Sequence, residues 1–207
     1  MTAFHWFAPQ ALFLLLTMPV RAAHAQTWEF EARLDGTLIG SHRFVVSGPP
    51  SAREVQSSAR FDVKVLGITI YRYRLDARER WQADCLSELH SRTDVDGELV
   101  QVDLDRDGAL AGSERCMMSF AYWHPRLREQ GRLLNPQTGL VEDARFERLS
   151  DAPLRVHGRD VGAARWRLFA STSKATQELI LWLRSTDGAW IGLDARVKGR
   201  LLTYRLP

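Results

Sequence analysis

"TWEFEARLDGTLIGSHRF" occupies residues 27–44 and decides the fold class of this chain. In its first half, apolar and charged residues alternate: Trp28, Phe30, Ala32 and Leu34 share one face, and Glu29, Glu31, Arg33 and Asp35 share the other. A two-residue period is typical of a β-strand with one face in the core and one in water. Asp35-Gly36 follows, and Asp-Gly is a strong hairpin signal because glycine accepts a positive φ. We therefore predict an antiparallel hairpin here.

The same period recurs along the chain, at residues 60–65, 71–76, 100–105 and 165–168. The segment "ELILWL", residues 178–183, is apolar on both faces and predicts a more buried strand. Further Asp-Gly pairs separate the candidate strands at 96–97, 107–108 and 187–188. Together these signals predict a mainly β fold, a single strongly curved antiparallel sheet or unclosed barrel of about ten strands.

Two stretches depart from the alternation. Residues 119–131, "SFAYWHPRLREQG", predict one short helical segment with Pro125 near its first turn. Residues 150–163, "SDAPLRVHGRDVGA", predict a loop that crosses a strand pair. Neither stretch is long enough to form a separate unit, so we expect a single β domain over residues 26–207.

The first 25 residues have the pattern of a secretory signal peptide. An apolar run at residues 11–16 precedes Ala23-His24-Ala25, a small-residue cleavage site, so we expect cleavage after Ala25 and a periplasmic location. A retained membrane anchor is the alternative. The formal charge of +3 becomes +2 once Arg21 is removed. Export argues against nucleic acid as a partner and makes an anionic membrane surface the more reasonable partner for outward arginines. The favoured alternative is that these arginines form an ordinary solvated surface without a partner.

A calcium-loop pattern lies between two of the predicted turns. Asp103, Asp105 and Asp107, with Gly108 and Glu114, match the spacing of such loops. A calcium loop of this kind follows a helix, but residues 93–102, "TDVDGELVQV", contain a turn and then alternate. We interpret the first two aspartates as the polar face of a strand and Asp107-Gly108 as a hairpin turn. No metal site and no cofactor is predicted.

Two cysteines, Cys85 and Cys116, invite a disulfide in an exported chain. A straight meander with turns at 96–97 and 107–108 argues against it, because the cysteines would then lie about nine residues, or roughly 30 Å, apart along the sheet. Only a bent or broken meander would bring them together. The straight meander favours two unpaired thiols.

No familiar catalytic motif is present: the chain has no G-x-S-x-G, no glycine-rich phosphate loop and no H-E-x-x-H. The aromatic residues are more informative. Most aromatic side chains pack in cores, but several can also line an apolar pocket inside a curved sheet. The candidate wall residues are Trp123, Trp182, Trp190 and Tyr204.

The segment "FAYWHPRLREQGRLLNPQTG", residues 120–139, is similar to the bacterial exported family named domain of unknown function 6134. Supporting stretches are "YRYRLDARERW" and the C-terminal "LWLRSTDGAWIGLDARVKGRLLTYRL", so the resemblance spans the mature chain. Leu183 stands where the resemblance leads us to expect tyrosine, and Cys85 where we expect glycine. The resemblance implies no catalytic residues. It also implies a distant likeness to periplasmic carriers, such as the lipoprotein-localisation carriers, whose unclosed barrel surrounds an apolar cavity.

These observations support three hypotheses. The leading one is a non-enzymatic periplasmic binding module for a lipid or other apolar ligand, with the helical segment near Trp123 as a lid. The second is an envelope enzyme with scattered polar catalytic groups, such as His124 with Asn135. The third is a purely structural envelope protein with a filled core. An enzyme predicts a perturbed histidine or carboxylate in the pocket, whereas a carrier predicts an apolar cavity.

Overall fold

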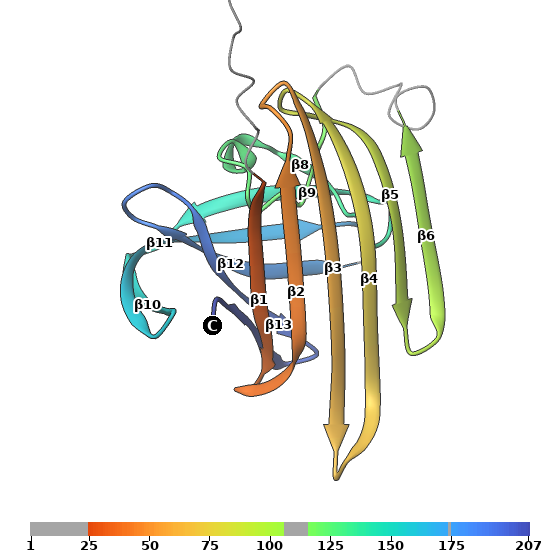
Figure 1. Cartoon of the computed structure of the whole chain (residues 1–207), viewed down its shortest axis with the longest axis vertical. Coiled ribbons are helices and arrows are strands. Elements are labelled where there is room, and N and C mark those ends of the chain that lie inside the picture. The colour runs from red at the N-terminus through yellow and green to blue at the C-terminus, as the bar shows by residue number, and fades with distance from the viewer. Residues whose placement is uncertain (1–24, 106–115, 174) are drawn as a thin grey trace, which may run out of the picture.

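The computed structural model describes residues 25–105, 116–173 and 175–207. Its first half is an antiparallel meander whose strands run side by side along the long axis (Figure 1). These strands are β1 (Gln26–Leu34), β2 (Thr37–Ser47), β3 (Ala52–Val65), β4 (Ile68–Gln82), β5 (Cys85–Val95) and β6 (Glu98–Asp105). The first hairpin turn, at Asp35-Gly36, has positive φ at both residues, as the sequence predicts.

The second half contains shorter elements and more interruptions. They are β7 (Met118–Ser119), the 3-10 turn η1 (Leu127–Glu129), β8 (Arg132–Leu134), β9 (Val141–Arg148), β10 (Ala152–Val156), β11 (Arg159–Ser171), β12 (Thr176–Arg184), β13 (Trp190–Val197) and β14 (Arg200–Arg205). In Figure 1, β9, β11 and β12 run across the direction of β3 and β4. The sheet therefore curves strongly between its two halves.

One hydrogen-bonded path joins all of these strands except β10, in the order β6-β5-β4-β3-β2-β1-β14-β13-β12-β11-β9-β8-β7. The C-terminal strand β14 returns to pair with β1, with Glu31 opposite Arg205, which unites the two halves. All pairs are antiparallel except β7 with β8. The fold is thus a mainly β, unclosed sheet.

The inner face of the curved sheet holds the main core. Its largest fully buried side chains include Trp81, Trp190, Phe30, Leu89 and Leu181. A second, smaller apolar cluster joins β10 to β11, β12 and β13; its buried members are Leu154, Val156, Ala163, Trp182 and Ile191. In β1, β4 and β5 buried and more exposed residues alternate, so their part of the core follows from the two-residue period, whereas β12 and β13 are buried on both faces over several residues.

The predicted number of strands was too low: the described residues form fourteen strands, not about ten. The expected loop at 150–163 was wrong, because β10 and the start of β11 form a hairpin there. Leu154 and Val156 of β10 are buried in the second cluster, and Pro153 is tolerated because β10 pairs on one side only. The helical segment is confirmed as one 3-10 turn, and the buried strand at 178–183 is confirmed within β12.

The expectation of two unpaired thiols was also wrong. Cys85 and Cys116 form a disulfide, with their Cα atoms 4.9 Å apart. The meander ends at β6. The next described residues, from Cys116 on, lie beside the beginning of β5, where the Leu86 amide donates to the Met117 carbonyl at 2.9 Å. The disulfide therefore links β5 to the residues just before β7, across the two ends of the strand order.

In the described ranges, no helix has the length and apolar character needed to cross a membrane.

Candidate functional site

Residues 117–139, which we call the cap, lie against the inner face of the sheet and leave a cavity of about 80 Å³ beneath them. The sheet contributes inward residues of β2, β3 and β4, which are His42, Phe44, Val55, Ser57, Leu75, Ala77 and Glu79. The cap contributes Phe120, Ala121, Tyr122, Trp123, Asn135, Pro136 and Gln137, and β12 contributes Gln177. The cavity thus has apolar walls with a few polar groups.

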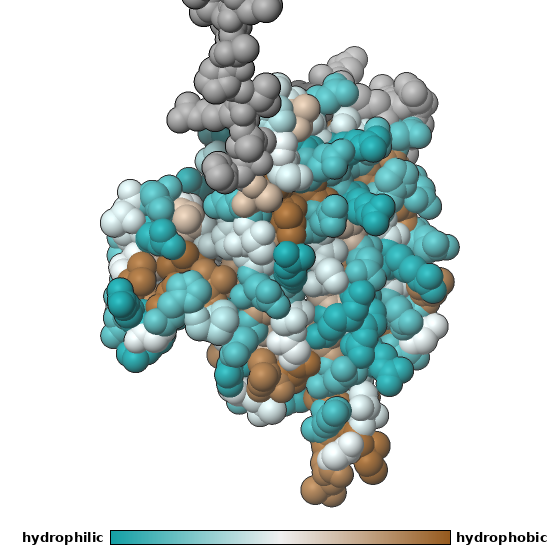
Figure 2. Space-filling model, in the orientation of Figure 1, coloured by the Kyte–Doolittle hydropathy of each residue, from teal (hydrophilic) through white to brown (hydrophobic). Residues whose placement is uncertain are grey.

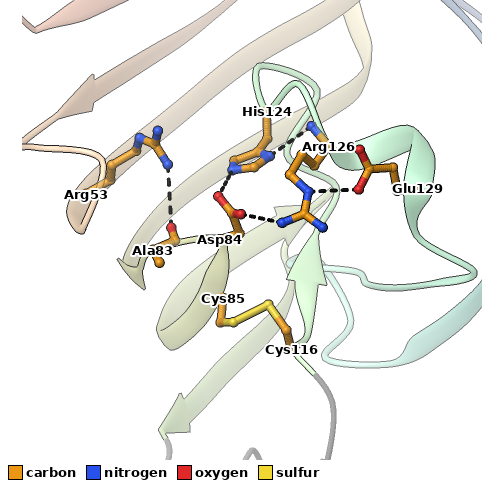
Figure 3. The surroundings of a disulfide bond; sticks show 8 residues. All are labelled: Arg53, Ala83, Asp84, Cys85, Cys116, His124, Arg126 and Glu129. Atoms are coloured by element: carbon orange, nitrogen blue, oxygen red, sulfur yellow. Dashed lines mark hydrogen bonds and ion pairs between the residues drawn. A yellow bond between two sulfur atoms is a disulfide. The ribbon is translucent and has the colours of Figure 1, made fainter.

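One end of the cap is held by the disulfide and by a charged cluster beside it (Figure 3). The Asp84 carboxylate contacts the His124 ring at 3.1 Å and accepts from Arg126 at 2.7 Å. Arg126 also donates to Glu129 at 2.8 Å. The bond from Arg126 lowers the pKa of Asp84, and burial lowers the pKa of His124. This cluster fixes the cap to the turn between β4 and β5.

The other end of the cap is tied to the second half of the sheet through Glu142 of β9. Its two carboxylate oxygens accept from the Asn135 side chain at 2.7 Å and the Gln177 side chain at 3.0 Å. Both amides line the cavity, while Glu142 itself is buried. The carboxylate therefore orients two polar side chains at the cavity wall.

His42 is the main polar group on the sheet side of the cavity. Its two ring nitrogens contact the Ser57 hydroxyl at 2.7 Å and the Tyr204 hydroxyl at 3.2 Å. Burial lowers the pKa of His42 to about 3. The ring is therefore neutral at physiological pH, with one nitrogen donating and the other accepting a hydrogen bond.

Glu79 lies on the same inner face, farther along β4. It is buried and accepts a hydrogen bond from the Trp81 indole at 2.9 Å. Burial raises the pKa of this carboxyl group, because a charge is unfavourable where water is excluded. Trp81 in turn stacks on His124 and meets the edge of Trp123, so Glu79 connects the cavity wall to the cap.

The structure places the four predicted wall residues in different environments. Trp123 lines the cavity and is half-buried. Tyr204 does not line it but contacts His42, which does. Trp190 is almost fully buried in the main core, and Trp182 belongs to the second cluster, where its indole donates to Asp194. The predicted set is therefore not a single site.

The second hypothesis paired His124 with Asn135, and the structure does not bring them together. His124 bonds to Asp84 and does not line the cavity, whereas Asn135 bonds to Glu142 and does. His42, Ser57, Glu79 and Gln177 line the cavity but were not among the predicted site residues. Three of them could have been found from the sequence. Alternation places His42, Ser57 and Glu79 at inward positions between apolar neighbours, where a polar side chain costs free energy unless it is hydrogen-bonded.

The calcium-like pattern is only partly within the described residues. Asp103 and Asp105 lie on β6, as predicted, and Asp103 contacts His90 at 2.8 Å. Asp107, Gly108 and Glu114 lie outside the described residues. Among the residues that the structure describes, no group of three or more His, Cys, Asp or Glu side chains could hold a metal ion.

Comparison with known proteins places the chain in a family. No curated protein matches it. Among solved structures, it is similar to a β-barrel-like protein of domain of unknown function DUF1849 from Brucella abortus. The TM-score is 0.59 at 12% identity, over 91% of this chain and 97% of that one. That likeness shows the fold alone. The family model of Domain of unknown function (DUF6134) matches residues 30–207, and the chain therefore belongs to the DUF6134 family.

Proposed function

We propose that the chain is a non-enzymatic binding module that takes an apolar group of its ligand into the cavity beneath the cap. The observation that carries this proposal is a cavity with apolar walls between the curved sheet and the cap. Trp123, Phe120 and Leu75 supply apolar surface, and Asn135 and Gln177 supply amides held by a buried carboxylate. An apolar wall with a few oriented polar groups is the usual composition of a small-molecule site.

The size of the cavity limits the size of the ligand group that can enter it. Its volume of about 80 Å³ is well below the roughly 300–1,000 Å³ typical of pockets for drug-sized ligands. A cavity of this size has room for a small apolar group, such as the end of an acyl chain. A whole lipid chain would enter only if the cap moved, which would break the bond from Asn135 to Glu142.

Perturbed groups at the cavity raise the question of catalysis, because His42 contacts a serine hydroxyl. In acyl-transfer sites, a carboxylate orients the histidine and stabilises the imidazolium that forms when the serine is deprotonated. Here the third group is Tyr204, and burial raises the pKa of its hydroxyl well above the usual value, so it stays neutral. His42 itself resists protonation, with a pKa of about 3. This arrangement supports a hydrogen-bonding role rather than general-base catalysis.

The proposed location is the periplasm, after removal of a signal peptide at residues 1–25. The disulfide between Cys85 and Cys116 supports an oxidising compartment, because such bonds persist outside the cytosol. Cleavage after Ala25 would leave Gln26 as the new N-terminus, which intact-mass measurement of the exported protein would establish.

The first test fills the cavity. Ala77 lines it and is buried, so Ala77→Leu should lower affinity for a fluorescent fatty-acid probe about tenfold or more. Ala163→Leu is the matched control, because Ala163 is equally buried but belongs to the second cluster. Ala163→Leu overpacks its cluster, whereas Ala77→Leu has the cavity to fill, so urea unfolding should show at least as much destabilisation in the control. Equal loss of probe binding in both variants, or no binding by the unaltered protein, would contradict the proposal.

The second test concerns Trp123. Because it is half-buried at the cavity wall, Trp123→Ala should cost about 1–3 kcal/mol of probe affinity, more than it costs stability. Trp190→Ala is the control; it should cost about 3–5 kcal/mol of folding free energy because Trp190 is fully packed. Native mass spectrometry of protein purified from its own cells would then identify any ligand carried along.

A further inference from the structure

The β3–β4 hairpin extends beyond the strands on both sides of it. Pairing of β3 with β2 ends at Phe61 opposite Gly40, and pairing of β4 with β5 ends at Tyr73 opposite Val95. Residues 64–71, which we call the finger, lie beyond both limits and pair only within the β3–β4 hairpin, where Tyr71 is opposite Val63 and Thr69 is opposite Lys64. From Arg72, which still bonds to Asp96, to Ile68 at the tip, the finger projects by about 13 Å at roughly 3.3 Å per residue.

The finger is apolar, although it is exposed. Residues 64–70 are all exposed, and the exposed fractions are 51% for Val65, 98% for Leu66, 69% for Ile68 and 57% for Ile70. Figure 2 shows this apolar surface at the lowest tip of the molecule, next to a largely hydrophilic face. An isolated two-stranded hairpin with aliphatic side chains in water gains little from packing. An exposed apolar surface of this kind is typical of one that binds a partner or a membrane.

The turn residue at the tip gives independent support. Leu66 has a φ of +51°, in the left-handed region that a two-residue hairpin turn requires. The equivalent residues of the other hairpins at this end are Asp35, Asp96 and Lys198, with φ between +48° and +54°. Those three are polar. A leucine combines backbone strain with an almost completely hydrated side chain, and such a combination is retained where the residue has another role.

The charges near the finger are positive. Between Asp62 and Asp76, the charged residues are Lys64, Arg72 and Arg74, and no carboxylate occurs. Arg72 and Arg74 pair with Asp62, which leaves Lys64 exposed at the base of the finger. The acidic β5–β6 turn does not reach the tip of the finger, because Asp96 bonds to Arg72 at the base of the finger.

The β13–β14 turn lies at the same end and has the same composition. It joins the β1–β2 turn, since the Asp35 amide donates to the Leu201 carbonyl and Arg200 pairs with Asp35 at 2.7 Å. Val197 and Leu201 are exposed there, beside the exposed Lys198 and Arg196. Aliphatic residues with lysine and arginine at their edge are complementary to a bilayer with anionic headgroups.

We propose that the finger inserts into an anionic lipid surface, with Leu66 deepest and the β13–β14 turn in contact with the headgroups. A projection of about 13 Å is sufficient for the depth of roughly 5–10 Å that interfacial segments reach, without immersing the acidic β5–β6 turn. This inference does not depend on the cavity. It gives the protein a fixed orientation on the membrane, with the cap at the end remote from the lipid.

The insertion itself can be measured at residue 66. The chain has two cysteines and both are in the disulfide, so Leu66→Cys provides a single thiol for an environment-sensitive nitrobenzoxadiazole label. With vesicles of phosphatidylglycerol and phosphatidylcholine, we expect a blue shift and a severalfold rise in emission, weakened by high salt. The control is Leu140→Cys, since Leu140 is also an exposed leucine, at 55%, but lies on the β8–β9 connection. Its label should not respond. Unchanged emission at residue 66 at millimolar lipid would overturn the proposal.

A second variant separates binding from folding. Leu66→Asn provides a residue that the left-handed turn prefers, so the unfolding midpoint in urea should stay the same or rise. Its affinity for the anionic vesicles in a co-sedimentation assay should fall about tenfold or more. Leu140→Asn should leave the affinity unchanged. Equal affinity of Leu66→Asn and the unaltered chain would overturn the proposal. So would sedimentation showing that Leu66→Asn converts a dimer into a monomer, because the finger would then bind a second copy.

Discussion

The two ends of this curved sheet differ in whether their large apolar side chains are buried or exposed. At the cap end, the large apolar residues are covered: Trp81 is 1% exposed, stacks on His124 and donates to Glu79. At the finger end, Leu66 is 98% exposed, so the described residues leave its side chain almost uncovered. Both ends are hairpin turns of the same meander. The difference lies in what covers them, because residues 117–139 return to the first end and no described segment returns to the second.

This contrast indicates where the stability of the protein resides. The cap end contains the disulfide, the aromatic stack and the Asp84 cluster, and all of them join segments far apart in sequence. The finger itself has only local pairing within one hairpin. We therefore expect substitutions near the cap to lower the free energy of unfolding strongly and substitutions in the finger to change it little. The following predictions test that expectation, beginning with the largest effect.

Trp81→Ala should lower the free energy of unfolding by about 3–5 kcal/mol. The substitution removes a buried ring that contacts both Trp123 and His124, and it leaves the Glu79 carboxyl group without its indole donor. Urea unfolding at neutral pH measures the loss, with Leu66→Ala as the control at the finger end, where the change should stay within about 0.5 kcal/mol. Similar losses in both variants would remove the contrast between the two ends.

Joint replacement of Cys85 and Cys116 by alanine should cost about 3–4 kcal/mol. The disulfide closes a loop with a sequence separation of 31 residues, and its loss returns that conformational freedom to the unfolded chain. Urea unfolding with and without a reductant checks the prediction, because the reductant should affect only the unaltered protein. If the double variant were as stable as the oxidised protein, the cap would be held by its non-covalent contacts alone.

Acid should destabilise the protein through His42. Burial lowers its pKa in the folded state to about 3, whereas an unfolded histidine titrates near 6.5. Between these values the unfolded chain binds a proton that the folded chain does not, so stability falls as the pH falls. From pH 7.5 to 4.5, the unaltered protein should lose about 2–3 kcal/mol more than His42→Gln.

The comparison with His42→Gln is needed because Glu79 also makes the free energy of unfolding depend on pH. Burial raises the pKa of Glu79, so its contribution has the opposite sign: the fold favours the protonated form, and stability falls as the pH rises through the unfolded value. Both proteins contain Glu79, and the difference between their denaturation curves across pH isolates His42. Parallel pH profiles would mean that His42 is protonated in the folded state.

Gly97→Val should have the smallest effect, about 1–2 kcal/mol. Gly97 has a φ of +94° in the β5–β6 turn, where a β-branched residue is strained, but a Cβ atom there would meet no neighbouring atom. Chemical denaturation measures the loss. Gly97→Ala is a milder comparison, since it tests backbone strain without the branched side chain. Unchanged stability in the valine variant would show that the turn can adopt another conformation at little cost. The corresponding prediction for Gly108→Val lies outside the described residues.

Local patterns were sufficient to predict much of the architecture. The alternation at Trp28–Leu34 and at Tyr71–Leu75 identified strands, and the Asp-Gly pairs at 35–36, 96–97 and 187–188 identified turns. Both signals act over a few residues, because the pleat repeats every two residues and glycine removes a local steric barrier. β10 was missed for the same reason, since Pro153 and His157-Gly158 resemble a loop until burial against β11 is known.

The candidate site depended on contacts that no local pattern contains. His42 meets Tyr204 across 162 residues because the strand order joins β1 to β14, and Cys85 meets Cys116 although β6 and β7 stand at opposite ends of that order. The sequence alone determined which residues turn inward and which are too polar for that position. Only the tertiary structure decided which of them share a cavity, which tryptophan lines it and which hairpin stays uncovered, since these depend on where distant segments return to the sheet.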